Sequence, residues 1–385
     1  YSLAFVAGMS ILTACSSDDN NDNDGNGGNG NGNEIENGTI LKGTITSDVT
    51  LAAGNTYKLS GEYIVEEGGT LHIEEGVKII AVYDDIADYI LVKQGGKINA
   101  VGTPDKPIVM TSEKEEPGAW GGIHICGRAH TNAEGGKGSS EIGGAVYGGN
   151  DDADNSGTLQ YIRLEYTGFA FDEEHEANGI SFYSVGNGTI VDHCQAYKGS
   201  DDGFEFFGGS VNVSNLVAVS CSDDSFDWTE GWNGKGTNLV AYQEAESTLG
   251  YDCDCLMECD NNGSNNAATP VAHPVLKNLI LVGNGGSKQG IRLRAGTEVE
   301  IDNAKVCGKG QPLTVETALT ENALKNGTSK LTNITLTSEL SSKEGIYTHA
   351  DFIAVTSNKV DANLSYSSFE DIRKECSWMN GSWVK

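Results

Sequence analysis

Short segments in which apolar and polar residues alternate recur through most of the chain. In each of them, positions i and i+2 are apolar and the residue between them is polar or charged, the pattern of a half-buried β-strand. No helical spacing of apolar residues interrupts these segments. The clearest examples are the pairs Ile123/Ile125, Ile180/Phe182, Phe204/Phe206, Phe226/Trp228 and Ile291/Leu293. The pattern predicts many short strands joined by turns.

The strand segments also repeat. Residues 65–73 recur in similar form at 92–100, and the segment that begins at Val191 recurs at Val213, Asn238 and Asn278. A period of about 20–30 residues built only of short strands indicates a solenoid, here an all-β parallel β-helix. A β-sandwich is the alternative, but it would require antiparallel hairpins with two-residue turns.

Composition divides the chain into four parts: a truncated signal peptide (1–14), a flexible acidic tether rich in Gly, Asn and Asp (15–38), the β-helix (39–365) and a C-terminal cap (366–385). The tether lacks enough apolar residues to fold. In the cap, Phe369, Ile372 and Cys376 have helical spacing, and we expect this segment to cover the open last coil.

The N-terminal residues predict where in the cell the protein is located. Leu12-Thr13-Ala14-Cys15 resembles a bacterial lipobox, and the acidic residues after Cys15 resemble the surface-export signal of Bacteroidetes lipoproteins. We therefore expect lipidation of Cys15 and a lipid-anchored protein exposed on the outer membrane. The acyl chains would hold the protein on the membrane without a spanning segment.

Charge narrows the range of partners. The 385 residues contain 25 Lys+Arg and 55 Asp+Glu, a formal net charge of −30. We expect no binding to nucleic acid, because phosphate backbones are bound by clustered basic residues and the chain has no such cluster.

Eight cysteines follow Cys15. For Cys253, Cys255 and Cys259 we favour a structural or disulfide role over zinc, because the spacing matches zinc modules poorly.

Segments near the beginning and in the middle of the predicted β-helix carry a family resemblance. Residues 61–76, 107–112 and 118–123, together with the acidic segments 201–212 and 223–232, resemble a group of bacterial cell-surface proteins with a pectin-lyase-like right-handed β-helix. The resemblance covers nearly the whole predicted folded part. It implies the architecture and a surface location, and no established activity.

Acidic residues recur at one position of the repeat. The residue between the two apolar ones faces outward, which predicts a solvent-facing row of Ser181, Glu205, Asp227, Glu258 and Arg292. A second set of acids lies four residues earlier, at Asp201, Asp223 and Asp254, and Asp202 and Asp224 extend it. Neighbouring carboxylates about 4.8 Å apart repel one another. A Ca²⁺ site formed by Asp201, Glu205, Asp223, Asp227, Asp254 and Glu258 would relieve this repulsion, and a solvated ladder of turns is the alternative.

We also predict a ligand-binding surface. Phe207, Trp232 and Tyr242 are expected beside Glu205, Asp227, Glu258 and Arg292, where exposed rings could stack on sugars. Trp228 is expected to point inward.

The favoured function is non-catalytic binding of an extracellular glycan or another surface partner. A polysaccharide lyase or glycoside hydrolase that uses Asp201, Asp202, Asp223 and Asp224 is an alternative, although the Gly-His-Gly and Arg-Ile-Lys elements of the related hydrolases are missing. A third alternative is an accessory subunit of an outer-membrane uptake complex.

Overall fold

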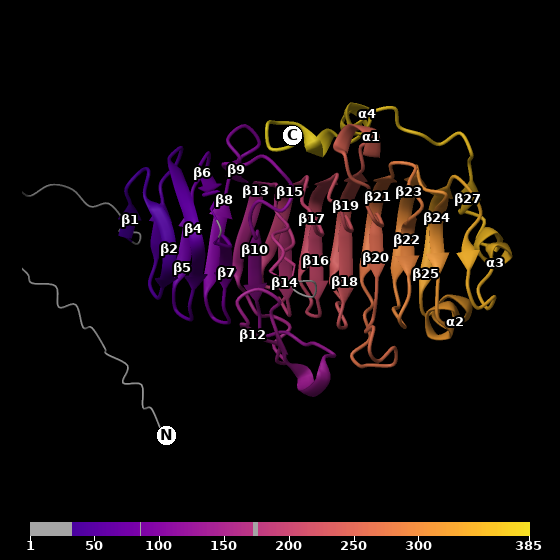
Figure 1. Ribbon diagram of the computed structural model, residues 1–385. Coiled ribbons are helices and arrows are strands. Elements are labelled where there is room, and N and C mark those ends of the chain that lie inside the picture. Colours follow the sequence, from indigo (N-terminus) through magenta and orange to yellow (C-terminus); the bar gives the residue numbers. More distant parts are fainter. Residues whose placement is uncertain (1–32, 85, 172–175) are drawn as a thin grey trace, which may run out of the picture. The chain divides into compact units, whose positions relative to one another are not determined.

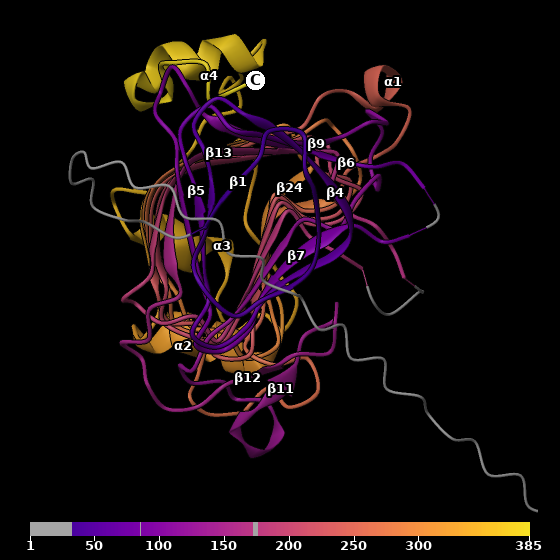
Figure 2. The ribbon, with the colours of Figure 1, turned by 90° about the vertical axis from the view of Figure 1, so that its left-hand side faces the viewer.

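The computed structural model describes residues 33–84, 86–171 and 176–385. Its strands are short, pair in parallel from coil to coil, and join into a 25-stranded sheet. Each coil has three sides, so the pairing forms three ladders (Figures 1 and 2). The predicted right-handed parallel β-helix is confirmed.

The first ladder begins with four short strands and continues through the first halves of longer ones. Its members are β1 (Asn33–Ile35), β3 (Val49–Leu51), β5 (Thr70–Ile73), β8 (Lys97–Val101), β13 (Gly157–Glu165), β15 (Ile190–Tyr197), β17 (Asn212–Val219), β19 (Lys235–Tyr242), β21 (Val275–Val282), β23 (Glu300–Cys307) and β25 (Lys330–Leu336).

The second ladder is formed by the second halves of those longer strands. Before these half-strands the ladder contains β2 (Ile40–Ile45), β4 (Thr56–Val65), β6 (Lys78–Ala81) and β9 (Ile108–Ser112). After them it ends with β27 (Lys359–Val360), which pairs with β25.

The third ladder carries the acidic row. It runs from the end of β4 through β7 (Tyr89–Val92), β10 (Ile123–Cys126), β14 (Ile180–Tyr183), β16 (Phe204–Phe207), β18 (Phe226–Thr229), β20 (Met257–Cys259), β22 (Gln289–Leu293), β24 (Gln311–Val315) and β26 (Ser341–Ser342).

Asparagines make the corner between the first two ladders. Asn215, Asn238, Asn278 and Asn303 have φ of 55°, 58°, 60° and 64°, a left-handed conformation that Asn tolerates better than most residues. The side-chain amides of Asn238, Asn278 and Asn303 each donate to the asparagine of the previous coil, over 2.8 Å, 3.0 Å and 2.9 Å. This stack bends the long strands at the same point in successive coils.

The predicted inward pairs form the core. Phe204, Phe206 and Phe226 are 2% exposed or less, and Phe204 stacks on Phe226 with ring centres 5.6 Å apart. The interior is therefore a column of like residues from consecutive coils, and this packing holds the third ladder in register.

Helices are few and peripheral: α1 (Glu246–Leu249), α2 (Ala318–Asn326), α3 (His349–Ala354) and α4 (Phe369–Glu375). Two 3-10 turns, Glu134–Gly136 and Ser377–Met379, and a small hairpin of β11 (Gly138–Ser139) and β12 (Val146–Tyr147) complete the elements. Among the described residues, none of these helices has the length and apolar character needed to cross a membrane.

The predicted position of the C-terminal segment, over the open last coil, is wrong. The helix α4 forms where the spacing indicates, but Ile372 and Trp383 pack against Val217, Val240 and other outward residues of the second ladder, along the flank of the coils (Figures 1 and 2). The last coil is covered by other residues, since Phe352 of α3 is fully buried in the interior core. The segment lies on the flank because its apolar residues are buried there against outward apolar residues of β17 to β23.

The N-terminal boundary also differs. β1 begins at Asn33 and pairs with β3, so residues 33–38 belong to the β-helix and not to the tether. The predicted signal peptide, Cys15 and the rest of the tether lie outside the described residues.

Candidate functional site

Three carboxylates stand side by side on the third ladder. Glu205 of β16 pairs with Asp227 of β18, which pairs with Glu258 of β20, and Glu258 pairs with Arg292 of β22. The predicted register is therefore confirmed. Their exposure differs from the prediction: these four side chains are partly buried, and Ser181, one coil earlier, is fully buried.

A second set of acids lies in the turn that precedes each strand. The backbone N–H of Asp224 donates to the Asp202 carboxylate over 2.8 Å, and that of Cys255 donates to the Asp224 carboxylate over 2.6 Å. Gly203 follows Asp202, where a Cβ would lie 2.7 Å from the Ser225 carbonyl oxygen. This close approach requires glycine at Gly203, whereas the next coil has Ser225 at the same position.

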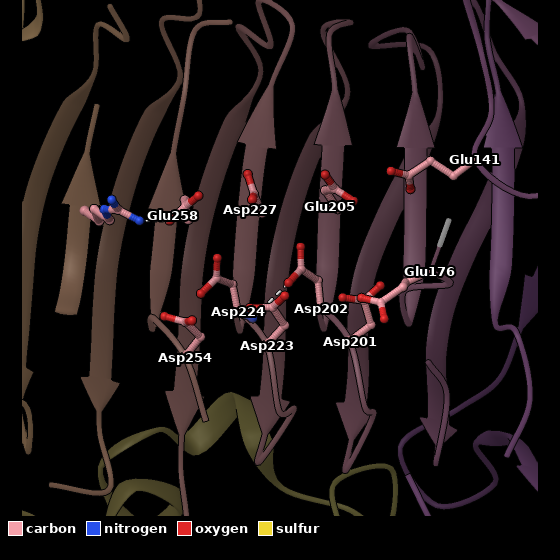
Figure 3. A pocket seen from close by; sticks show the side chains of 11 residues that line it. Glu141, Glu176, Asp201, Asp202, Glu205, Asp223, Asp224, Asp227, Asp254 and Glu258 are labelled. Carbon is pink, nitrogen blue, oxygen red and sulfur yellow. Dashed lines mark hydrogen bonds and ion pairs between the residues drawn. The ribbon is translucent and has the colours of Figure 1, made fainter. Parts of the chain in front are cut away.

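These rows line a cavity of about 320 Å³. Two further carboxylates reach it from loops: Glu141, in the β11–β12 hairpin, and Glu176, which precedes β14. The labelled side chains gather around one space in Figure 3. The lining residues are Glu141, Glu176, Asp201, Asp202, Glu205, Asp223, Asp224, Asp227, Asp254, Glu258 and Arg292.

The basic residues near the cavity neutralise only one end of it. Glu258 pairs with Arg292 over 2.8 Å and with Arg294 over 2.6 Å. Asp254 pairs with Lys288. The acids of the two preceding coils form no ion pair with any described residue, namely Asp201, Asp202, Glu205, Asp223, Asp224 and Asp227. Six carboxylates thus share one site without an ion pair to any described residue.

Burial and mutual repulsion change the protonation of this cluster. Burial, followed by the charge of Asp223, raises the pKa of Asp201 to about 8. Burial and the charge of Asp254 raise the pKa of Asp223 to about 6. Burial is also the main reason that the pKa values of Asp202, Glu205, Asp224 and Asp227 lie well above the ordinary range. Without a cation, part of the cluster stays protonated at neutral pH.

The oxygen atoms are close enough together to share a cation. Asp202, Glu205 and Asp227 each offer an oxygen within 4.8 Å of the others, as do Glu176, Asp201 and Asp223. Ca²⁺ binds oxygen at about 2.3–2.6 Å, so ligands on opposite sides of one ion are about 5 Å apart. Asp227 also has a buried Oδ1 with no hydrogen-bond partner among the described residues. The donor set therefore fits Ca²⁺.

The predicted aromatic platform is wrong. Phe207 is 8% exposed and stacks on Tyr183 at 4.5 Å, in a cluster that includes Ile142 and Tyr147 of the hairpin region. Trp232 is 1% exposed and stacks on Phe206 at 4.2 Å inside the coils. The hairpin region covers Phe207, and the turn after β18 directs Trp232 into the interior, and alternation within the strand reveals neither.

Tyr242 is also outside the site. It ends β19, on the second ladder, and its ring lies 5.4 Å from that of Phe369 in the C-terminal segment. Trp228 points inward as predicted and donates from Nε1 to Thr297. The acids predicted for metal and ligand binding are brought together with Arg292, and the three aromatics are not.

Sequence reasoning missed Glu141 and Glu176. Neither occupies a repeated position, and only the path of each loop brings it to the cavity. Glu141 accepts a hydrogen bond from the Tyr183 hydroxyl over 3.2 Å. The predicted disulfide role is not found, because the eight cysteines within the described ranges are buried and form no disulfide.

A family model described as a pectate-lyase like beta helix domain matches residues 43–384. A comparison with curated proteins gives no match. Among solved structures, the chain is similar to the crystal structure of the Dettilon tailspike protein (gp208), with 8% identity and a TM-score of 0.31. The match covers 77% of this chain and 56% of the tailspike chain, so this chain spans little more than half of that protein.

Proposed function

Since the chain belongs to the pectate-lyase-like β-helix family, we propose that it binds carbohydrate at the acid cavity and does so through divalent cations. The observation that carries this proposal is the set of six carboxylates that have no cationic partner among the described residues. Ca²⁺ is the favoured ion because the available donors are hard oxygens, and Ca²⁺ accepts six to eight of them.

Cations also determine which carbohydrate can bind. A metal-free cavity lined by ten carboxylates repels an acidic sugar and holds neutral hydroxyl groups only through carboxylate oxygens. Ions at Glu176/Asp201/Asp223 and Asp202/Glu205/Asp227 would offset most of the charge of these acids and leave coordination positions for ligand oxygens. The proposed ligand is therefore an acidic glycan that binds only in the presence of Ca²⁺.

Acid catalysis is the second candidate. A carboxyl group with a pKa of about 8, as at Asp201, carries a proton at neutral pH and could donate it to a glycosidic oxygen. The ionised form of Asp223, whose pKa is about 6, lies one coil away and could act as the base. This arrangement supports a glycoside hydrolase, or a lyase if Ca²⁺ is bound, and binding without turnover remains the first candidate.

The proposed location is the outer-membrane surface, with the protein held by lipid on Cys15. This proposal is supported by the lipobox-like residues 12–15 alone. An accessory role in an uptake complex would appear as a stoichiometric outer-membrane partner after detergent solubilisation of the lipidated protein.

The test is retention on a panel of immobilised acidic and neutral glycans, with either millimolar Ca²⁺ or EDTA. We expect Ca²⁺-dependent retention on acidic glycans, loss of retention in Asp227→Asn, and no change in Asp105→Asn, an exposed turn residue outside the cavity. Retention that is equal in EDTA would contradict the proposal. New reducing ends or ultraviolet-absorbing products that disappear in Asp223→Ala would establish the catalytic alternative instead.

A further inference from the structure

The row of turn residues beside the cavity has one sulfur position in an otherwise carboxylate pattern. The turn residues Asp202 and Asp224 occupy equivalent places in consecutive coils, and the next coil has Cys255 there. Cys255 is fully buried, and its Sγ–H donates to Asp254 Oδ1 over 3.3 Å. A thiol is a softer donor than any of its neighbours, so this end of the cavity differs chemically from the rest.

Asp224, Asp254 and Cys255 each offer one ligand atom within 4.8 Å of the other two. If sulfur and oxygen bond one tetrahedral ion at about 2.3 and 2.1 Å, they are about 3.6 Å apart. The 3.3 Å between Sγ and Asp254 Oδ1 is close to that separation. Lys288 pairs with the other Asp254 oxygen, Oδ2, and leaves Oδ1 to face the sulfur.

Asp224 provides an independent observation that points to a ligand. It is 4% exposed, and its Oδ1 accepts the Cys255 N–H. Its second oxygen has no hydrogen bond or ion pair among the described residues, and the carboxylate points into the cavity beside Asp254 (Figure 3). A carboxylate buried to this extent loses most of its solvation, and a cation bound at its second oxygen would offset that cost.

We propose that Asp224, Asp254 and Cys255 form a second metal site, for a thiophilic divalent ion of the Zn²⁺ and Cd²⁺ class. Binding breaks the S–H bond of Cys255 and forms a sulfur–metal bond, and the proton passes to the buffer. The site goes beyond the proposed function, since it requires neither Ca²⁺ nor a glycan. It also explains why a cysteine occupies this position of the acidic repeat.

The test is titration of the EDTA-stripped, fully reduced chain with Cd²⁺, followed by the ultraviolet thiolate-to-metal charge-transfer band. We expect a band that saturates at one ion per chain, with release of the Cys255 proton and of any proton that the metal-free Asp224 carries. Cys255→Ser should abolish the band. Cys253→Ser, which removes a buried thiol two residues away and outside the proposed ligand set, should retain it.

A second variant tests the site even if Cys255→Ser misfolds. Asp224→Asn keeps the thiol, and it should weaken Cd²⁺ binding by more than the roughly 10- to 100-fold typical of losing an outer partner of a metal ligand. No band in the wild type, a band that survives Cys255→Ser, or unchanged affinity in Asp224→Asn would overturn the site. Ca²⁺ binding retained in Cys255→Ser would separate this result from the fate of the proposed function.

Discussion

The outward residues on two sides of the same coils have opposite surroundings. On the second ladder, Val217 and Val240 point outward and are covered by Ile372 and Trp383 of the C-terminal segment. On the third ladder, Asp227 points outward into a cavity, and its buried Oδ1 has no partner among the described residues. One side is completed by the chain itself, whereas the other leaves charge for something outside the chain to bind.

This difference separates structural positions from functional ones. Both sides have the same strand alternation, so alternation identifies which residues point outward but not what they meet. Apolar outward residues are satisfied by packing, which gains free energy on burial. Buried carboxylates lose solvation and repel one another, so a position of this kind is unfavourable for stability until a cation binds.

The largest expected effect is on the side covered by the C-terminal segment. Trp383→Ala removes a fully buried ring and should lower the free energy of unfolding by about 3–5 kcal/mol. The loss should be the same with Ca²⁺ and with EDTA, as measured by denaturant titration. If the variant also lost its response to Ca²⁺, the two sides would not be independent.

The next effect concerns the acid side. Ca²⁺ at about 100 times its dissociation constant should stabilise the wild type by about 2.7 kcal/mol relative to EDTA. Asp202→Asn should reduce this gain, because it removes a carboxylate from the group Asp202, Glu205 and Asp227. Thermal unfolding in Ca²⁺ and in EDTA measures both values. An equal gain in the variant would place the ion elsewhere.

Stability of the metal-free protein should also depend on pH. The folded-state pKa of Asp201, about 8, exceeds its ordinary value of 3.8, so the folded state binds more protons than the unfolded state between those values. The contribution of Asp201 to stability is therefore lost as pH rises from about 4 to 8. Asp201→Asn should flatten this slope in EDTA, and saturating Ca²⁺ should reduce it in the wild type. A wild-type slope that Asp201→Asn leaves unchanged would contradict the assignment.

The smallest effect is expected at Arg292. Its partners are Glu258, which retains Arg294, and Glu316 at 3.3 Å. Arg292→Gln should therefore cost about 1 kcal/mol or less in EDTA. It should also tighten Ca²⁺ binding, because a positive charge beside the cavity is removed. Weaker Ca²⁺ binding in calorimetric titration would argue that Arg292 positions the acids.

The repeat made the fold and the acidic row predictable. In a parallel β-helix, equivalent positions stack, so the spacing of Glu205 and Asp227 in the sequence was enough to place them side by side. Exposure was not predictable in the same way. Phe207 and Trp232 are buried by a hairpin and a turn whose paths follow from no repeat, and Glu141 enters the cavity for the same reason.

Tyr242 and the C-terminal helix show a second limit. Both were assigned from local spacing, which identifies a strand end or a helix but not which of the three sides it meets. Tyr242 lies on the second ladder, and Phe369 packs against it there. The apolar outward residues of β17 to β23 were the available signal for this contact, since a row of outward valines needs a cover.

The most direct measurement is the Ca²⁺ content of the EDTA-stripped chain after equilibrium dialysis against Ca²⁺. Saturable binding of at least one ion per wild-type chain is predicted, with loss of binding when Asp202 and Asp227 are both changed to Asn. A wild type that takes up no Ca²⁺, or a double variant that takes up as much, would contradict the claim that the acid cavity is a cation site.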